Sequence, residues 1–212
     1  GKKFSIKYDI GINHPAIVGR SGKLPMLFHN VSLDYVVSRA WTVGIKYGFM
    51  TYNAPVERTV FGSEVGYYGS TGNFNSYDYK GRYTQHTVSF IAKKFFIKKG
   101  YLAPVGRYVL LGVYYQYVDD HFAKLKASGY DPYGYSEYIV QGRRGIAHYA
   151  GFSFGLGRHF VVARRMLVDL GFTISGSPFY PLNGSEEQQA VYRDLALRNL
   201  FQLRLGLGVL AF

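Results

Sequence analysis

The residues best suited to activating a water molecule stand together in the sequence as Asp119-Asp120-His121. A carboxylate beside an imidazole can act as a general base, so this cluster is a candidate for hydrolysing a lipid or a peptide. Such a site needs further acidic groups that face the first ones, and the sequence offers no second cluster of aspartate beside histidine. The favoured interpretation is a solvated surface or a contact with a divalent cation, and no residue is predicted to be catalytic.

A second candidate is the pair His86 and Ser89, which could supply a base and a nucleophile. Residues three apart in a strand point to opposite faces, so a direct proton relay between these two is unfavourable. The chain has no cysteine, and its histidines lack the spacing of a zinc site. Its glycines follow strand interiors rather than a phosphate-binding turn. We therefore expect neither a metal nor a cofactor.

The composition combines many aromatic residues with a neutral average hydropathy. The 212 residues include 26 Gly, 21 Tyr and 16 Phe, yet the mean hydropathy is -0.07. A membrane-spanning helix needs about 20 consecutive apolar residues, and the apolar runs here are far shorter. A strand that crosses a membrane needs about 9–11 residues with one apolar face. The length indicates a single domain, residues 1–212.

Apolar and polar residues alternate in segment after segment. In one of them Trp41, Val43 and Ile45 alternate with Thr42 and Gly44, which is the pattern of a strand with two unlike faces. The pattern predicts eight strands, at residues 4–12, 30–38, 41–49, 83–95, 107–118, 146–157, 166–175 and 201–209.

The links between these strands alternate in length. The second, fourth and sixth links are short, near residues 39, 98–104 and 158–163, whereas residues 13–26, 53–82, 119–144 and 176–199 are long links. This plan predicts an all-β fold, an eight-stranded antiparallel transmembrane β-barrel with short periplasmic turns, long extracellular loops and both termini periplasmic. Partly helical spacing within residues 186–199 predicts a short amphipathic helix.

The polar face of the strands distinguishes this fold from a soluble sandwich or a lipocalin-like barrel. It is rich in Gly and Ser and holds a nearly balanced set of charges, which is typical of an enclosed lumen. The predicted lumen charge network is Lys7, Asp9, Asp34, Lys46, Asp169 and Arg204. Inward tyrosines at 108, 114 and 149 should help to close the lumen, so a metabolite pore is not expected. The strand ends predict interfacial girdles of Trp41, Phe49, Tyr52, Phe95, Phe96, Tyr115 and Tyr117.

The net charge of +12 is concentrated near the short turns, where no acidic residue stands. This predicted basic periplasmic rim would contact phospholipid headgroups or an acidic periplasmic partner. Its members are Arg39, Lys93, Lys94, Lys98, Lys99, Arg107, Arg158, Arg164 and Arg165. Tyr-rich stretches at 67–83 and 130–138 could stack on bases, but long external loops have the same composition, so no nucleic acid is expected.

The eight alternating segments, the short-turn and long-loop plan and the closing segment 203–212 resemble the OmpA transmembrane-domain and OmpX type of small outer-membrane barrel. Residues 100–108 also look like the mid-barrel periplasmic turn of that family. The resemblance implies the outer membrane of a Gram-negative bacterium, and it implies that Phe212 is part of an assembly signal. Phe212 is out of phase with Leu205, Leu207 and Val209, and a bulge near Leu210 would restore the phase.

The expected function is that of a non-enzymatic structural or accessory subunit of a larger outer-membrane complex, such as barrel-assembly or secretion machinery. The expected partners are outer-membrane lipids, including lipopolysaccharide, and other outer-membrane or periplasmic proteins. A surface adhesin or binding barrel, a rim hydrolase that uses Asp119, Asp120 and His121, and a small channel stay as alternatives.

Overall fold

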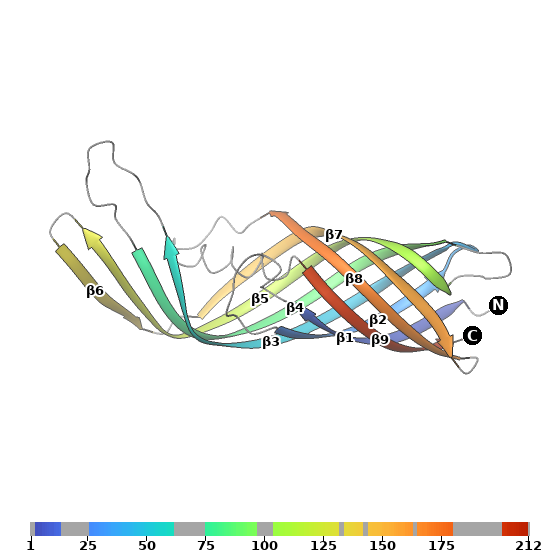
Figure 1. The fold of residues 1–212 in the computed structure, drawn as a ribbon, viewed down its shortest axis with the longest axis horizontal. Coiled ribbons are helices and arrows are strands. Elements are labelled where there is room, and N and C mark those ends of the chain that lie inside the picture. Colours follow the sequence, from blue (N-terminus) through green and yellow to red (C-terminus); the bar gives the residue numbers. More distant parts are fainter. Residues whose placement is uncertain are drawn as a thin grey trace. The chain divides into compact units, whose positions relative to one another are not determined.

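Nine β-strands make up most of the computed structural model, which describes residues 3–13, 26–61, 75–96, 104–131, 134–141, 144–162, 165–179 and 201–211. No helix among these residues is long and apolar enough to span a membrane. The strands, labelled in Figure 1, are β1 Phe4–Asn13, β2 Met26–Val36, β3 Trp41–Phe61, β4 Asn75–Phe96, β5 Gly106–Asp131, β6 Gly134–Gln141, β7 Arg144–Val162, β8 Met166–Phe179 and β9 Phe201–Ala211.

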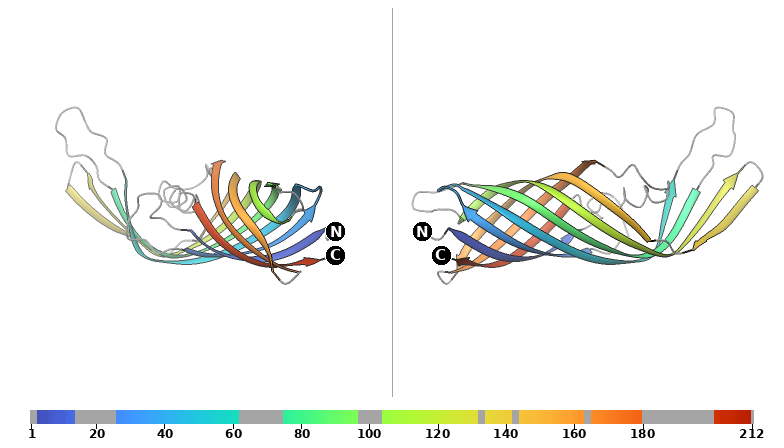
Figure 2. Two further views of the ribbon diagram at one scale, coloured as in Figure 1. Left: turned by 45° about the vertical axis from the view of Figure 1, so that its right-hand side comes forward. Right: turned by 180° about the vertical axis from the view of Figure 1, so that it is seen from behind.

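Eight of the nine strands form a closed ring. The sheet order is β4-β3-β2-β1-β9-β8-β7-β5, and β4 also pairs with β5, which closes the sheet on itself. The first and last strands pair antiparallel from Phe4↔Ala211 to Asn13↔Gln202, so β1 begins beside the end of β9 (Figure 2). The predicted eight-stranded antiparallel barrel is thus confirmed, with predicted and observed strands at the same places in the chain.

The chain divides into two compact units. The first comprises Gly1–Met50, Gln85–Val118 and Ala147–Phe212 and contains part of every strand of the ring. The second comprises Thr51–Thr84 and Asp119–Ile146, and in it β5 pairs with β6 from Lys124↔Gln141 to Asp131↔Gly134.

Two regions predicted as long loops contain strands. β3 continues to Phe61, β4 already begins at Asn75, and β5 continues to Asp131 before the additional strand β6. The prediction took the Tyr-, Gly- and Ser-rich composition of these segments as that of loops, although tyrosine and other residues there also favour extended backbone. The helix predicted within residues 186–199 lies outside the described residues.

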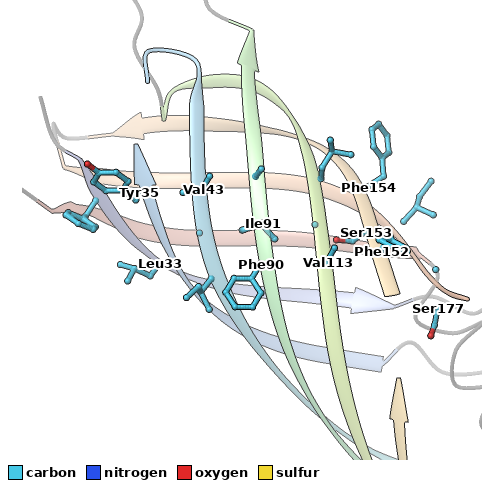
Figure 3. Close-up of a pocket in the computed structure, with 18 residues that line it drawn as sticks. Leu33, Tyr35, Val43, Phe90, Ile91, Val113, Phe152, Ser153, Phe154 and Ser177 are labelled. Carbon is cyan, nitrogen blue, oxygen red and sulfur yellow. The ribbon is translucent and has the colours of Figure 1, made fainter. Parts of the chain in front are cut away.

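The faces of the ring strands are inverted with respect to a soluble barrel. Along β1 the buried residues are Ser5, Lys7 and Asp9, whereas Ile6 is 54% exposed and Tyr8 46%. The same outward apolar face recurs on the other strands of the ring. Part of it forms an open apolar hollow with Leu33, Phe90 and Phe154 in its lining (Figure 3). These outward apolar side chains are unfavourably exposed in water but match the hydrocarbon chains of lipids. The barrel therefore crosses a membrane.

The end of β9 keeps its register without interruption. Its pairing with β1 continues to Ala211 and its pairing with β8 continues to Val209, with no shift in either ladder. The bulge that the sequence allowed near Leu210 is therefore not formed among the described residues. Phe212 lies outside them, and its role in assembly stays a prediction.

Closure of the ring can be tested with paired cysteines, because the chain has no cysteine of its own. Ile6→Cys with Val209→Cys places two thiols at directly opposed positions of β1 and β9, where cross-strand Cβ atoms are about 4.5–5.5 Å apart. Mild oxidation should link them and give a reduction-sensitive band shift on a denaturing gel. The control pair Ile6→Cys with Leu203→Cys should not link, because Leu203 pairs with Ile12. Equal linking of both pairs would contradict the closed register.

Candidate functional site: the lumen network and the basic end

Inward glycines make room for the charged side chains of the lumen. Asp34 pairs in register with Gly44 on β3, and Lys7 pairs with Gly208 on β9. A Cβ atom added at either glycine would collide with the side chain of its partner. The interior of an eight-stranded barrel is only just wide enough for side chains to fill, so a glycine on the neighbouring strand gives these charged side chains their space.

Lys7 is the centre of a buried ion-pair network. Its Nζ lies 3.1 Å from Asp34 Oδ2 and 3.1 Å from Asp169 Oδ2, so one ammonium bridges two carboxylates on different strands. Asp34 Oδ2 also lies 2.6 Å from Lys93 Nζ. All four side chains are at most 1% exposed, which leaves the charges to compensate one another without water.

The carboxylate of Asp169 extends the network towards β5, β7 and β9. It accepts a hydrogen bond from the Tyr108 hydroxyl at 2.6 Å, and that hydroxyl accepts one from Arg204 Nη2 at 3.0 Å. His159 Nδ1 lies 2.8 Å from the Pro104 carbonyl oxygen, which can only accept, so Nδ1 carries the hydrogen. The other nitrogen of His159, Nε2, lies 3.0 Å from Asp169 Oδ2.

An aromatic and aliphatic cluster stands beside this network. Ile91, Phe95, Tyr108 and Leu110 are buried together, and the partly buried Val36 packs against them. The Phe95 ring centroid lies 5.3 Å from that of Tyr108 and 5.3 Å from that of His159. Phe95 was predicted in an interfacial girdle, but it occupies the lumen because it has the strand phase of Ile91 and Lys93.

The structure places each of the six predicted lumen residues in the interior, and four of them join one network. Lys7, Asp34, Asp169 and Arg204 are linked directly or through Tyr108. Asp9 and Lys46 are buried apart from these contacts, and both carboxylate oxygens of Asp9 lack a hydrogen-bond partner in the described part of the chain.

Sequence reasoning missed Lys93 and His159 as lumen residues. Lys93 was predicted in the basic rim, but it is 1% exposed because β4 turns its Lys93 face inward and its Lys94 face outward. His159 was assigned to a short turn, whereas β7 continues to Val162 and turns the imidazole inward. The alternation of Arg158 with His159 was the available signal.

The short-turn end of the ring is the end where β2 joins β3, β4 joins β5 and β7 joins β8. Lys94 Nζ lies 5.7 Å from the ring centroid of Trp41, and the Arg158 guanidinium lies 4.6 Å from that of Phe160. Lys98, Lys99 and Arg164 lie outside the described residues. The exposed members of the predicted rim, called the basic end below, are Arg39, Lys94, Arg107, Arg158 and Arg165.

The candidate hydrolytic groups are arranged differently from a catalytic set. In the second unit Arg144 holds Asp119 with two hydrogen bonds of 3.0 and 2.7 Å, and His121 Nδ1 lies 3.5 Å from the same carboxylate. The side chain of Asp120 is not among those that the structure describes. In the barrel His86 faces outward, where its Nδ1 lies 2.7 Å from the Tyr47 hydroxyl, whereas Ser89 is buried. The opposite faces predicted for His86 and Ser89 are thus observed.

Three tyrosine–histidine pairs lie on the outer face and were not foreseen. Their hydroxyl-to-Nδ1 distances are 2.6 Å for Tyr8 with His29, 2.7 Å for Tyr47 with His86 and 2.5 Å for Tyr115 with His148. Each hydrogen bond joins two neighbouring strands and satisfies polar atoms on a surface that otherwise faces hydrocarbon. Tyr117 lies next to both His86 and His148, with ring centroids 6.0 and 5.5 Å away.

No protein-family model and no curated protein matches the chain. Among solved structures, Neisserial surface protein A gives a TM-score of 0.51 at 12% identity, over 98% of this chain and 97% of that one. The chain has the fold of a small outer-membrane β-barrel. The N-terminal barrel of Pseudomonas aeruginosa OprF gives 0.48 at 12% identity over 99% and 98% of the two chains. Ail of Yersinia pestis gives 0.42 at 11% identity over 98% and 95%.

The space opposite Asp34 can be tested by filling it. Gly44→Ala in the barrel should lower the free energy of unfolding by about 1–3 kcal/mol, because the added methyl group meets both the Asp34 carboxylate and the Leu33 carbonyl. The measurement is a urea titration in detergent micelles. The matched control is Gly176→Ala, since a Cβ atom there has no neighbour within 4 Å among the described residues. Equal losses in both variants would contradict the steric argument.

The hydroxyl of Tyr108 can be removed without emptying the lumen. Tyr108→Phe deprives Asp169 of one donor and Arg204 of its acceptor, so the barrel should lose about 1–3 kcal/mol of unfolding free energy. The same urea titration measures this loss, with the outward-facing Tyr35→Phe as control. An unchanged midpoint for Tyr108→Phe would show that the hydroxyl does not stabilise the network.

Proposed function

We propose that the protein is a non-enzymatic barrel of a Gram-negative outer membrane that serves as a structural or accessory subunit of a larger complex. In this proposal the short-turn end and both termini face the periplasm, as in barrels of this plan. The basic end engages an acidic surface of a periplasmic or outer-membrane protein. The observation that carries the proposal is the unbalanced charge of this end.

The exposed charge at the basic end has one sign. The acidic residues of the neighbouring strand segments are Asp34 and Asp169, and both are buried in the lumen. Lys7 and Lys93 compensate the charges of these two carboxylates, so the carboxylates do not neutralise the exposed arginines. Outside the membrane such a surface attracts anionic groups over about one Debye length, roughly 8 Å at physiological ionic strength. A complementary acidic surface on a partner fits this field.

The interior of the barrel supports a role that depends on the surface. Lys7, Asp169, Tyr108 and His159 occupy the same cross-section and are at most 1% exposed. Opening a passage there would separate ion pairs in a low-dielectric interior, at a cost of several kcal/mol. Transport through the lumen is therefore disfavoured relative to binding at an end.

The proposal predicts that a partner depends on the charge of Arg39, Arg107 and Arg165. We expect the triple Arg→Gln variant to bind its partner on the order of 100-fold more weakly, since each cation near an anionic surface contributes about 1 kcal/mol. The protein is crosslinked in cells, extracted in mild detergent and purified, and the amount of each co-purifying protein is measured. The triple Arg→Lys variant is the matched control and should restore the partner because it keeps the charge.

Phospholipid headgroups could satisfy the same cations without a protein partner. Reconstitution into vesicles with and without phosphatidylglycerol measures this contribution separately. A wild-type barrel that purifies as a lone monomer would overturn the subunit proposal. So would a partner whose recovery is unchanged in the triple Arg→Gln variant, even if that variant loses its preference for anionic vesicles.

A further inference from the structure

A small polar chamber lies in the lumen, apart from the network centred on Lys7. Every strand of the ring contributes to its lining, and all lining residues belong to the first unit. Its volume is about 40 Å³. The polar side chains around it include Asn30, Lys46, Gln116, Ser153, Ser175 and Gln202.

Lys46 is the charged residue of this lining, and no carboxylate accompanies it there. Its side chain comes from β3 and is only 8% exposed. No hydrogen bond or ion pair joins its ammonium to another residue in the described part of the chain. Asn30 Nδ2, a donor on β2, is likewise buried without a hydrogen-bond partner there. An unpaired buried ammonium is strongly unfavourable unless a counterion compensates it.

The charges of the lumen do not balance without such a counterion. The buried cations in the described part of the chain are Lys7, Lys46, Lys93 and Arg204, and the buried carboxylates are Asp9, Asp34 and Asp169. Four positive charges against three negative ones leave one positive charge. Asp34 and Asp169 are already engaged by Lys7 and Lys93. The carboxylate of Asp9 acts on Lys46 through space, but Asp9 does not line the chamber and forms no ion pair with Lys46 in the described part of the chain.

From these observations we propose that the chamber is a binding site for one small monovalent anion, of the halide class, held by Lys46. The charge of the ion matches the single excess cation, and amide and hydroxyl groups of the lining supply further donors. A cavity needs about 10–15 Å³ to hold one water molecule, so this chamber has room for a few water molecules or for a monatomic anion. The site is independent of the proposed partner at the basic end.

The test compares chloride and bromide with gluconate, a much larger monovalent organic anion. The purified barrel is unfolded with urea in detergent at equal ionic strength in each sodium salt. Because an ion that binds only the folded state stabilises it, the wild type should have a higher midpoint in chloride and bromide than in gluconate. Lys46→Met should remove this difference, whereas Lys46→Arg should retain it. The exposed Lys3→Met variant should behave as the wild type and so controls for general salt effects.

Crystals grown in sodium bromide give the second measurement. We expect an anomalous difference peak in the chamber of the wild type and none in Lys46→Met, a readout that does not depend on stability. Equal wild-type midpoints in chloride and gluconate, together with an empty chamber in bromide, would overturn the proposal. A bromide peak that persists in Lys46→Met would overturn the assignment of Lys46 as the residue that holds the ion.

Discussion

The width of the lumen is the constraint on which the rest of the structure depends. Eight strands enclose an interior that side chains alone can fill, so each large inward residue needs an empty position beside it. Glycine supplies that position, as Gly44 does for Asp34 and Gly208 does for Lys7. The charged side chains then reach one another across the lumen and compensate their charges. Inward glycines therefore allow the charged side chains of the lumen to pair.

Inward polarity and outward hydrophobicity have the same origin in this barrel. A strand has two faces, and because the outer one must match hydrocarbon inside the membrane, the inner one holds most of the polar and charged residues there. Polar side chains on the outer face of the ring also find partners, since His29, His86 and His148 each bond to a tyrosine of a neighbouring strand.

The alternation of the sequence was sufficient to predict the ring because a period of two is visible wherever the two faces differ. It was not sufficient where two similar residues are adjacent. Lys93 and Lys94 give no local indication of which one points inward, and Phe95 and Phe96 repeat the ambiguity. Which residue of each pair points inward follows only from the position of the whole strand in the sheet. Strand β6 was missed for another reason, because its sequence lies in a Tyr-, Gly- and Ser-rich segment whose composition was taken for that of a loop.

The contacts in the lumen distinguish the buried cations that stabilise the barrel from Lys46, which is available to a ligand. Lys7 and Lys93 are each paired with a carboxylate, and Arg204 is joined to the carboxylate of Asp169 through the hydroxyl of Tyr108. The composition of the polar face indicated a nearly balanced set of charges, but balance over the whole lumen does not ensure balance at each position. Lys46 differs from the other buried cations because it faces amides and hydroxyls in a chamber of its own. A buried cation that no carboxylate reaches directly or through one hydroxyl is strongly unfavourable unless an anion compensates it.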